Sequence, residues 1–209
     1  MEQHKKIIVV GGSAAGPKAA ARARRMDEQA EITLFQQSPD MSMASCGYPY
    51  YVGGFFQDRN ELLGSPGSVR DTAYFWNAKK IRTHVRTQVL SIDRKRRQVE
   101  YLHLDTGERG TAPYDKLVIA TGAVPRKPPV PGVDLAGVTT LQSMQDADFL
   151  RKVRDEGKIR KAVVIGGGLI GIETCEALHL AGIQITLIEL LPQLLTFLDN
   201  QMARLVEQY

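Results

Sequence analysis

The sequence contains very little cysteine. Only two of its 209 residues are cysteines, Cys46 and Cys175, and they lie far apart in the chain. Two isolated cysteines supply neither a disulfide framework nor the ligand spacing of a metal site, so neither is expected. Such scarcity is typical of a protein from a reducing compartment.

The sequence also lacks a long apolar run. No stretch approaches the roughly 20 apolar residues that a membrane-spanning helix needs. The first residues, Met1–Lys6, are largely charged or polar, and only four apolar residues separate them from the first glycine. This pattern does not fit a signal peptide. We therefore expect a soluble, cytoplasmic protein with no membrane partner.

Aromatic residues are absent from the two basic clusters of the chain. These clusters lie at Arg22–Arg25 and Arg94–Arg97, within a formal net charge of +4. Without interleaved aromatic residues or a nucleic-acid motif, a solvated face is favoured over a nucleic-acid surface. Anionic cofactors would suit the same charge balance.

Glycine is present where two phosphate-binding turns would need it. The apolar run Ile7–Val10 predicts a buried parallel strand, and the glycine-rich segment Gly11–Gly16 leads from it into a helix over about 17–26. A second strand, Glu31–Phe35, ends at Gln36. A strand, glycine turn, helix and strand in this order bind dinucleotides through backbone N–H groups and a helix N-terminus.

This first motif departs from the usual pattern at two positions. Ser13 replaces the middle glycine, and Gln36, twenty residues after Gly16, replaces the acid that accepts hydrogen bonds from the ribose. A glutamine oxygen still accepts, although it carries no charge. The alternative is a glycine-rich turn that binds nothing.

The second motif is complete. The strand 162–165 enters Gly166, Gly168 and Gly171, and the next strand ends at Glu189, eighteen residues after the last glycine. A carboxylate there binds both ribose hydroxyls and repels a 2′-phosphate, which predicts NAD(H) rather than NADP(H). Two such motifs in one chain are much stronger evidence than one. Cys175, on the following helix, is interpreted as a packing residue.

Cys46 lies in the segment Ser45–Gly54. Pro49 is tolerated in a first helical turn, which would put Cys46 near the N-terminus of a short helix, where a thiolate is favoured. The alternative is a small buried hydrophobic residue, the commoner role of an isolated cysteine.

The middle of the chain is expected to be mixed in structure. A loop through Asn60–Ser68 precedes a helix over about 69–79. The patterns at Thr83–Val85, Val89–Ile92 and Val99–Tyr101, with a turn at 105–107 and a return through Tyr114, suggest an antiparallel excursion of three short strands that can close one face of the first sheet. Strand 116–120, a proline-rich connector and a charged helix over about 144–156 follow.

In this order, the landmarks resemble the flavoprotein disulfide reductases with two dinucleotide-binding domains. The single cysteine in Ser45–Gly54, with tyrosine at position 51, is similar to the branch containing coenzyme A disulfide reductase, NADH oxidase and coenzyme A persulfide reductase. The resemblance implies an α/β fold of two Rossmann-like, three-layer domains, the second one incomplete. It places an FAD-binding domain at 1–125, a connector at 126–145 and half of an NAD(H)-binding domain at 146–209.

The resemblance also implies roles for individual residues. Cys46 would be the redox thiol beside the flavin, and Glu173 would lie near the junction of nicotinamide and flavin. The FAD contacts would be Gly11, Gly12, Ser13, Ala15, Gly16, Gln36, Thr121 and Gly122. The NADH contacts would be Gly166, Gly168, Leu169, Ile170, Gly171 and Glu189. Leu169 lacks the phenol of a tyrosine that gates the nicotinamide pocket in some relatives.

The same resemblance implies a coenzyme A site. Arg22 and Arg25 would bind the phosphates of this carrier, with Ser42 on the approach to Cys46. A solvated helix face explains the same arginines. The family continues past residue 209 with the rest of the NADH domain, a ribityl-binding segment and an interface domain that pairs two subunits. We therefore expect a fragment of a homodimeric protein, with its last helix at about 200–209.

Three functions remain open at this point. The first is NADH-dependent reduction of a disulfide or persulfide of a small thiol such as coenzyme A. The second sends electrons to oxygen or peroxide through a Cys46 sulfenate. The third is a nucleotide-binding fragment without activity, in which FAD retention is doubtful.

Overall fold

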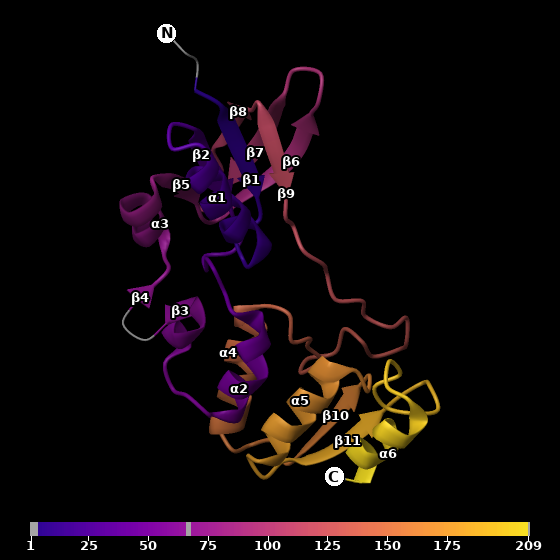
Figure 1. Ribbon diagram of the computed structural model, residues 1–209. Coiled ribbons are helices and arrows are strands. Elements are labelled where there is room, and N and C mark those ends of the chain that lie inside the picture. Colours follow the sequence, from indigo (N-terminus) through magenta and orange to yellow (C-terminus); the bar gives the residue numbers. More distant parts are fainter. Residues whose placement is uncertain (1–3, 66–67, 209) are drawn as a thin grey trace. The chain divides into compact units, whose positions relative to one another are not determined.

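The computed structural model describes residues 4–65 and 68–208, which form two units (Figure 1). The first unit contains the described residues up to Ser45 and Asn60–Val124. The second contains Cys46–Arg59 and Pro125–Tyr209, of which Tyr209 lies outside the described residues. Residues 46–59 thus belong to the second unit although the chain on both sides of them belongs to the first.

A parallel sheet forms the centre of the first unit. Its strands are β1 (Lys6–Val10), β2 (Glu31–Phe35), β5 (Ile81–His84) and β9 (Lys116–Ile119), in the order β5-β2-β1-β9. All three neighbouring pairs are parallel. Their carboxyl ends therefore meet at one edge, where open α/β sheets bind ligands.

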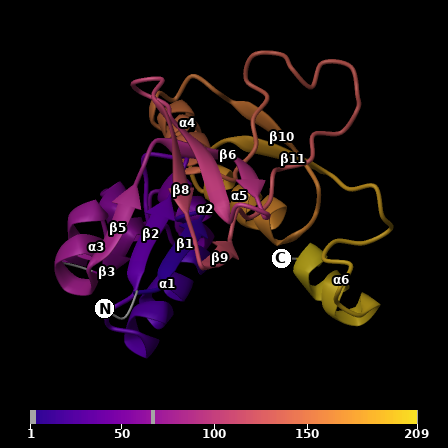
Figure 2. The same ribbon diagram turned by 90° about the horizontal axis from the view of Figure 1, so that it is seen from above.

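The two faces of this sheet have separate hydrophobic cores. On one face α1 (Ala15–Met26) and α3 (Thr72–Lys79) pack on alternate strand residues, with Val9, Leu34, Ala20 and Phe75 buried. On the other face, Ile8 and Val10 pack with Val99 of a second sheet. Figure 2 shows the first unit seen along a perpendicular direction.

The second sheet of this unit is the antiparallel excursion that the sequence predicts. It consists of β6 (Thr87–Asp93), β7 (Gln98–His103) and β8 (Arg109–Pro113). The strand predicted at Thr83–Val85 is not part of it, because β5 pairs parallel with β2 and extends the central sheet.

The predicted helix at 69–79 begins later than expected. Val69 pairs with Gly64 in a short hairpin of β3 (Gly64–Ser65) and β4 (Ser68–Val69), and α3 starts only at Thr72. Asp71 caps the helix by accepting a hydrogen bond from the Tyr74 N–H at 2.8 Å. Pro66 and Gly67 of the predicted loop lie outside the described residues.

The second unit contains a pair of parallel strands with helices. β10 (Lys161–Ile165) pairs with β11 (Gln184–Ile188), and α5 (Leu169–His179) contacts both strands. The short α2 (Tyr48–Gly53) contacts α5 and α4 (Met144–Asp155), and α6 (Asn200–Gln208) follows last. The α/β fold class expected from the sequence is confirmed. Among the helices of the described residues, none has the length and apolar character needed to cross a membrane.

Candidate functional site

The first glycine turn brings a helix start directly against the end of β1. Gly11 has a φ of +106°, which favours glycine, and its N–H donates to the Phe35 carbonyl at 2.8 Å. A Cβ on Gly16 would overlap the Gly11 carbonyl oxygen. The turn and the first residues of α1 therefore approach with no side chain between them.

Gln36 is bonded into this turn. Its Oε1 accepts the Gly12 N–H at 2.9 Å, and its Nε2 donates to Ser38 Oγ at 2.8 Å and to the Asp40 carbonyl at 3.1 Å. The Ser42 N–H donates to the Gly12 carbonyl at 2.7 Å. Ser42, to which the family resemblance gives a place near the substrate, is thus a neighbour of the first glycine turn.

The start of α1 is open to a ligand. Ser13 and Ala15 are exposed, and the N-cap residue directly before the helix, Ala14, makes no side-chain capping hydrogen bond. The N–H groups of a first helical turn have no partner within the helix, so they are available to an anion. Thr121 and Gly122 are also exposed and follow β9, whose carboxyl end lies beside that of β1.

The second turn repeats the first in its backbone geometry. Gly166 has a φ of +111° and its N–H donates to the Ile188 carbonyl at 2.8 Å. A Cβ on Gly171 would overlap the Gly166 carbonyl oxygen, as for Gly16 and Gly11. The Leu195 N–H donates to the Gly167 carbonyl at 2.9 Å, which is the counterpart of the bond from Ser42.

Glu189 occupies the position of Gln36 in the second turn. Its carboxylate accepts the Gly167 N–H at 2.6 Å and the Leu191 N–H at 2.9 Å. The backbone bonds, first from Leu191 and then from Gly167, lower the pKa of Glu189. The group is therefore held as an acceptor, the form that ribose hydroxyls require.

The two turns differ where a pyrophosphate would approach. A Cβ on Gly168 would meet nothing within 4 Å, whereas Ser13 carries a side chain at the corresponding position. Gly168 is the N-cap residue directly before α5 and offers no side-chain cap, and Leu169 and Ile170 after it are exposed. Both turns thus fit a dinucleotide, and the second has more room for it.

Cys46 is exposed and belongs to a 3₁₀ turn, Ser45–Gly47, directly before α2. The alternative of a small buried hydrophobic residue is therefore wrong. Pro49 lies in the first turn of α2, as predicted. The role of Cys46 as a redox thiol stays a prediction.

Glu173 of α5 lies beside α2. It lines a small gap with Pro49, Tyr50 and Phe55. The predicted nicotinamide-proximal glutamate and the helix that follows Cys46 are thus neighbours within the second unit. Cys175, on the same helix, is partly buried, and this burial raises the pKa of its thiol, in agreement with a packing role.

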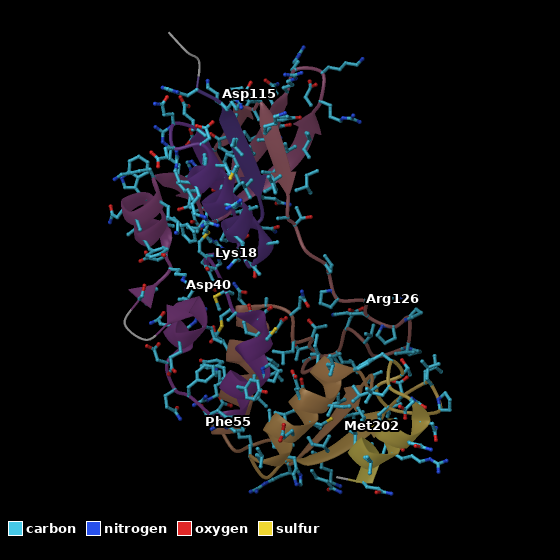
Figure 3. All side chains as sticks on the ribbon, in the orientation of Figure 1. Lys18, Asp40, Phe55, Asp115, Arg126 and Met202 are labelled. Carbon is cyan, nitrogen blue, oxygen red and sulfur yellow. The ribbon has the colours of Figure 1, made fainter. Side chains whose placement is uncertain are left out.

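The predicted substrate arginines share one exposed face of α1. Arg22 and Arg25 are exposed, and Lys18, labelled in Figure 3, precedes them at helical spacing. Arg24 differs, because it donates to the carbonyls of Lys79 at 3.0 Å and Glu28 at 2.5 Å. Three of the four cations are therefore available to a ligand, and the fourth is structural.

Sequence reasoning missed several residues of these sites. Leu195 was missed altogether, and Ser42 was assigned to the substrate and not to the first turn. Both have a left-handed φ, +45° and +54°, which no sequence pattern of a non-glycine residue indicates. Lys18 could have been found from its spacing to Arg22. Arg151 and Arg154 donate hydrogen bonds to carbonyls of α2, and no local sequence motif marks either residue.

Comparison with known proteins identifies the family. The family model described as pyridine nucleotide-disulphide oxidoreductase matches residues 5–209. The chain is 33% identical over 202 residues to coenzyme A disulfide reductase of Staphylococcus haemolyticus, covering 97% of this chain and 44% of that protein.

Solved structures agree with this assignment. A NAD-dependent persulfide reductase from A. fulgidus matches with a TM-score of 0.93 and 42% identity, over 97% of this chain and 37% of that one. A water-forming NADH oxidase from Lactobacillus brevis, bound to NADH, matches with a TM-score of 0.86 and 29% identity, over 98% of this chain and 44% of that one. The chain thus spans less than half the length of these proteins.

Proposed function

Because the chain belongs to the pyridine nucleotide-disulphide oxidoreductase family, we propose that its protein is an NADH-dependent flavoenzyme that reduces a disulfide or persulfide of a small thiol such as coenzyme A. The observation that carries the proposal is the exposed Cys46 at the start of α2, in a chain with two equivalent dinucleotide turns. The similarity to coenzyme A disulfide reductase and persulfide reductase supports the substrate class.

The two turns take different nucleotides in this proposal. Gly11, Gly12, Gln36, Thr121 and Gly122 hold FAD, with Ser13, Ala15 and Gly16 completing the turn. The segment Gly166–Gly171 and Glu189 hold NADH in preference to NADPH, because the carboxylate repels a 2′-phosphate. FAD, when bound, supplies two-electron transfer between a nicotinamide and sulfur.

Cys46 performs the sulfur chemistry. Its thiolate attacks one sulfur of the substrate disulfide, so that a mixed disulfide forms and one substrate thiolate leaves. Two electrons that originate from NADH then cleave the mixed disulfide, which releases the second substrate thiol and restores the Cys46 thiolate. No second protein cysteine is required, since the substrate supplies the partner sulfur.

The basic face of α1 recruits the substrate. Coenzyme A carries phosphate groups, and Lys18, Arg22 and Arg25 present exposed cations at spacings that share one helix face. Ser42 remains a proposed contact on the approach to Cys46. A cytoplasmic location is proposed on the basis of the low cysteine content, and a homodimer is proposed by analogy with the family.

A second candidate is an NADH oxidase. The similarity to the water-forming NADH oxidase favours it, since that protein shares the fold over nearly the whole chain. In this case Cys46 would cycle through a sulfenate rather than a mixed disulfide.

Titration of the reduced, purified protein with three acceptors separates these functions. We expect rapid reoxidation by coenzyme A disulfide or persulfide and slow reoxidation by oxygen. Rapid oxygen turnover with none on the sulfur substrates would favour the oxidase. A colourless protein that does not take up added FAD would show that this chain alone is not a flavoenzyme, whether or not it binds NADH.

The variant Cys46→Ser tests the role of the thiol in the same assay. Thiol-linked turnover should be lost, while reduction of the bound flavin by NADH should persist. Cys175→Ser is the matched control and should retain both. Full disulfide reductase activity in Cys46→Ser would show that the Cys46 thiol takes no part in the reaction.

A further inference from the structure

Two arginines of α4 hold the carboxyl end of α2. Arg151, only 8% exposed, donates from Nη1 to the carbonyls of Tyr51 at 2.6 Å and Phe56 at 3.1 Å. Arg154 donates from Nη1 to the Val52 carbonyl at 2.7 Å. These carbonyls lie at or beyond the last turn of α2, where most carbonyls lack a donor within the helix. The Tyr51 carbonyl also accepts the Gly54 N–H at 3.1 Å, so Arg151 adds a second donor there.

The Arg151 guanidinium is fixed on its other sides as well. Its Nη2 donates to Gln57 Oε1, and its Nε donates to Asp155 Oδ2 at 2.8 Å. The same Asp155 pairs with Arg154 at 3.1 Å. The guanidinium also lies 5.2 Å from the centroid of the Tyr51 ring, within cation–π range. Its planar fork therefore has little freedom to move away from α2.

Tyr51 is held at both of its polar ends. Its carbonyl accepts from Arg151, and its hydroxyl donates to Asp148 at 3.1 Å. Burial and then the hydrogen bond to Asp148 raise the pKa of this hydroxyl, so it remains a donor at neutral pH. Asp148 also pairs with Arg59 at 3.4 Å, which ties the chain on the far side of α2 to α4.

The position of α2 is set by its packing against α4 and α5 together with these bonds to α4. A helix of six residues cannot persist alone in water, so its orientation is set by what it packs against. Cys46 lies in the turn that enters this helix, two residues before its first residue. Anything that fixes the axis of α2 on α4 therefore also fixes the turn that carries the thiol.

We propose that Arg151, assisted by Arg154, is a positioning residue for Cys46. The proposal rests on the proposed function, in which the Cys46 sulfur must be presented to its reaction partners in one geometry. The arginine forks act on the backbone of α2 and through it on the cysteine turn, without touching the reacting sulfur. A misplacement of about 1 Å in a reacting group can lower a rate about 100-fold, so such a distant anchor can control turnover.

The test compares Arg151→Lys, Arg151→Ala and Arg154→Lys with the control Lys152→Ala in the purified protein. Lys152 lies on the same helix but its side chain is 74% exposed and pairs only with Glu156 among the ion pairs of the described residues. Lysine keeps the charge and loses the fork, so the lysine variants should be intermediate between the wild type and Arg151→Ala.

Two measurements follow the anchor without requiring activity. Amide hydrogen exchange over residues 50–54 should be about 10-fold faster in Arg151→Lys, because charge-assisted hydrogen bonds to the helix end are lost. Exchange in α1 of the first unit should be unchanged. A nitroxide attached to Cys46 in a Cys175→Ser background should give a more mobile spectrum in the Arg151 and Arg154 variants than in Lys152→Ala.

Turnover supplies the third measurement. In Arg151→Lys, kcat for the sulfur substrate should fall about 10-fold while the KM for NADH stays within about twofold, because the nucleotide turn is untouched. If Arg151→Ala fails to fold, the two lysine variants decide the question.

Several results would overturn the proposal. Unchanged exchange and an unchanged nitroxide spectrum would show that the arginines do not anchor α2. Faster exchange with full sulfur turnover would show an anchor that does not position the thiol. If the wild type lacks sulfur turnover, the proposed function fails separately, and immobility of the Cys46 label in the lysine variants would reject the anchor as well.

Discussion

The backbone N–H of Gly167 lies 2.6 Å from a carboxylate oxygen of Glu189, at the end of the neighbouring strand. The bond fixes the carboxylate beside the turn that we assign to the pyrophosphate of NADH. Its other oxygen accepts from Leu191. The carboxylate is thus oriented before any nucleotide arrives, which reduces the cost of ordering it on binding.

Replacement of this carboxylate should change the choice of cofactor. In Glu189→Arg, the ratio of kcat/KM for NADPH to that for NADH should rise about 10-fold or more, since a cation attracts the 2′-phosphate that the carboxylate repels. Steady-state kinetics with both nucleotides measure this ratio. Glu156→Arg makes the same charge change away from the turn and should leave the ratio unaltered. An unchanged ratio in both variants would remove Glu189 from the ribose site.

Two glycines of the second turn should respond differently to alanine. Gly171→Ala would drive a Cβ into the Gly166 carbonyl oxygen, so we expect a loss of about 1–3 kcal/mol in the free energy of unfolding. Gly168→Ala meets nothing within 4 Å and has an ordinary extended backbone, so the fold should keep its stability.

NADH binding separates the two glycine variants further. Because the Gly168 Cβ would occupy the space proposed for the pyrophosphate, Gly168→Ala should weaken NADH binding about 10-fold or more at unchanged stability. Thermal unfolding and fluorescence titration with NADH provide the two readouts. Normal NADH affinity in Gly168→Ala would argue that the pyrophosphate lies elsewhere.

The neighbouring arginines of α1 should also separate into two kinds. Arg22→Ala and Arg25→Ala should raise the KM for coenzyme A disulfide about 3- to 10-fold, because each removes an exposed cation. This increase in KM should become smaller as salt is added. Their melting temperatures should stay close to the wild-type value.

Arg24→Ala should show the opposite behaviour. This side chain bonds to the carbonyls of Lys79, Lys80 and Glu28, so its loss should destabilise the protein by about 1–3 kcal/mol and lower the melting temperature by several degrees. Its effect on the KM should be small. If all three variants behaved alike in kinetics, the basic face would be a solvated surface and not a substrate site.

Stability should depend on pH through His84. The ring stacks on Phe35 with centroids 5.2 Å apart, and desolvation, followed by the charges of Arg82 and His103, lowers the pKa of His84 below its ordinary value of 6.5. The unfolded chain therefore binds a proton at a higher pH than the folded chain does. The free energy of unfolding should be undiminished above about pH 6.5 and decrease as the pH falls through that value.

Urea unfolding between about pH 5 and 8 measures this dependence. His84→Phe keeps an aromatic partner for Phe35 and removes the titrating group, so its midpoint should vary less with pH than that of the wild type over the same range. His179→Phe, on α5 of the second unit, is the matched control and should retain the wild-type dependence. Equal slopes for all three proteins would assign the effect to another group.

The elements around the two glycine turns could be predicted from the sequence because their chemistry is local. A β-branched run such as Ile7–Val10 forms a buried strand, and glycines at fixed spacing allow the close approach seen between Gly16 and Gly11. The acceptors Gln36 and Glu189 lie at the predicted strand ends, and each accepts from the second glycine of its turn.

Long-range pairing could not be predicted in the same way. The pattern at Thr83–Val85 fits a strand of either sheet, and only its pairing with β2 assigns β5 to the central one. The anchoring of α2 by Arg151 joins residues about 100 positions apart. An arginine on a charged helix carries no local mark that distinguishes a buried fork from a solvated cation.

The matching construction of the two turns has a consequence for acid conditions. The Gln36 carboxamide has no proton to gain, whereas the Glu189 carboxylate becomes neutral once the pH falls below its lowered pKa. Acidification would thus remove the negative charge at the second turn and leave the uncharged acceptor at the first turn unchanged. The two glycine turns, alike in backbone geometry, would therefore differ in their response to low pH.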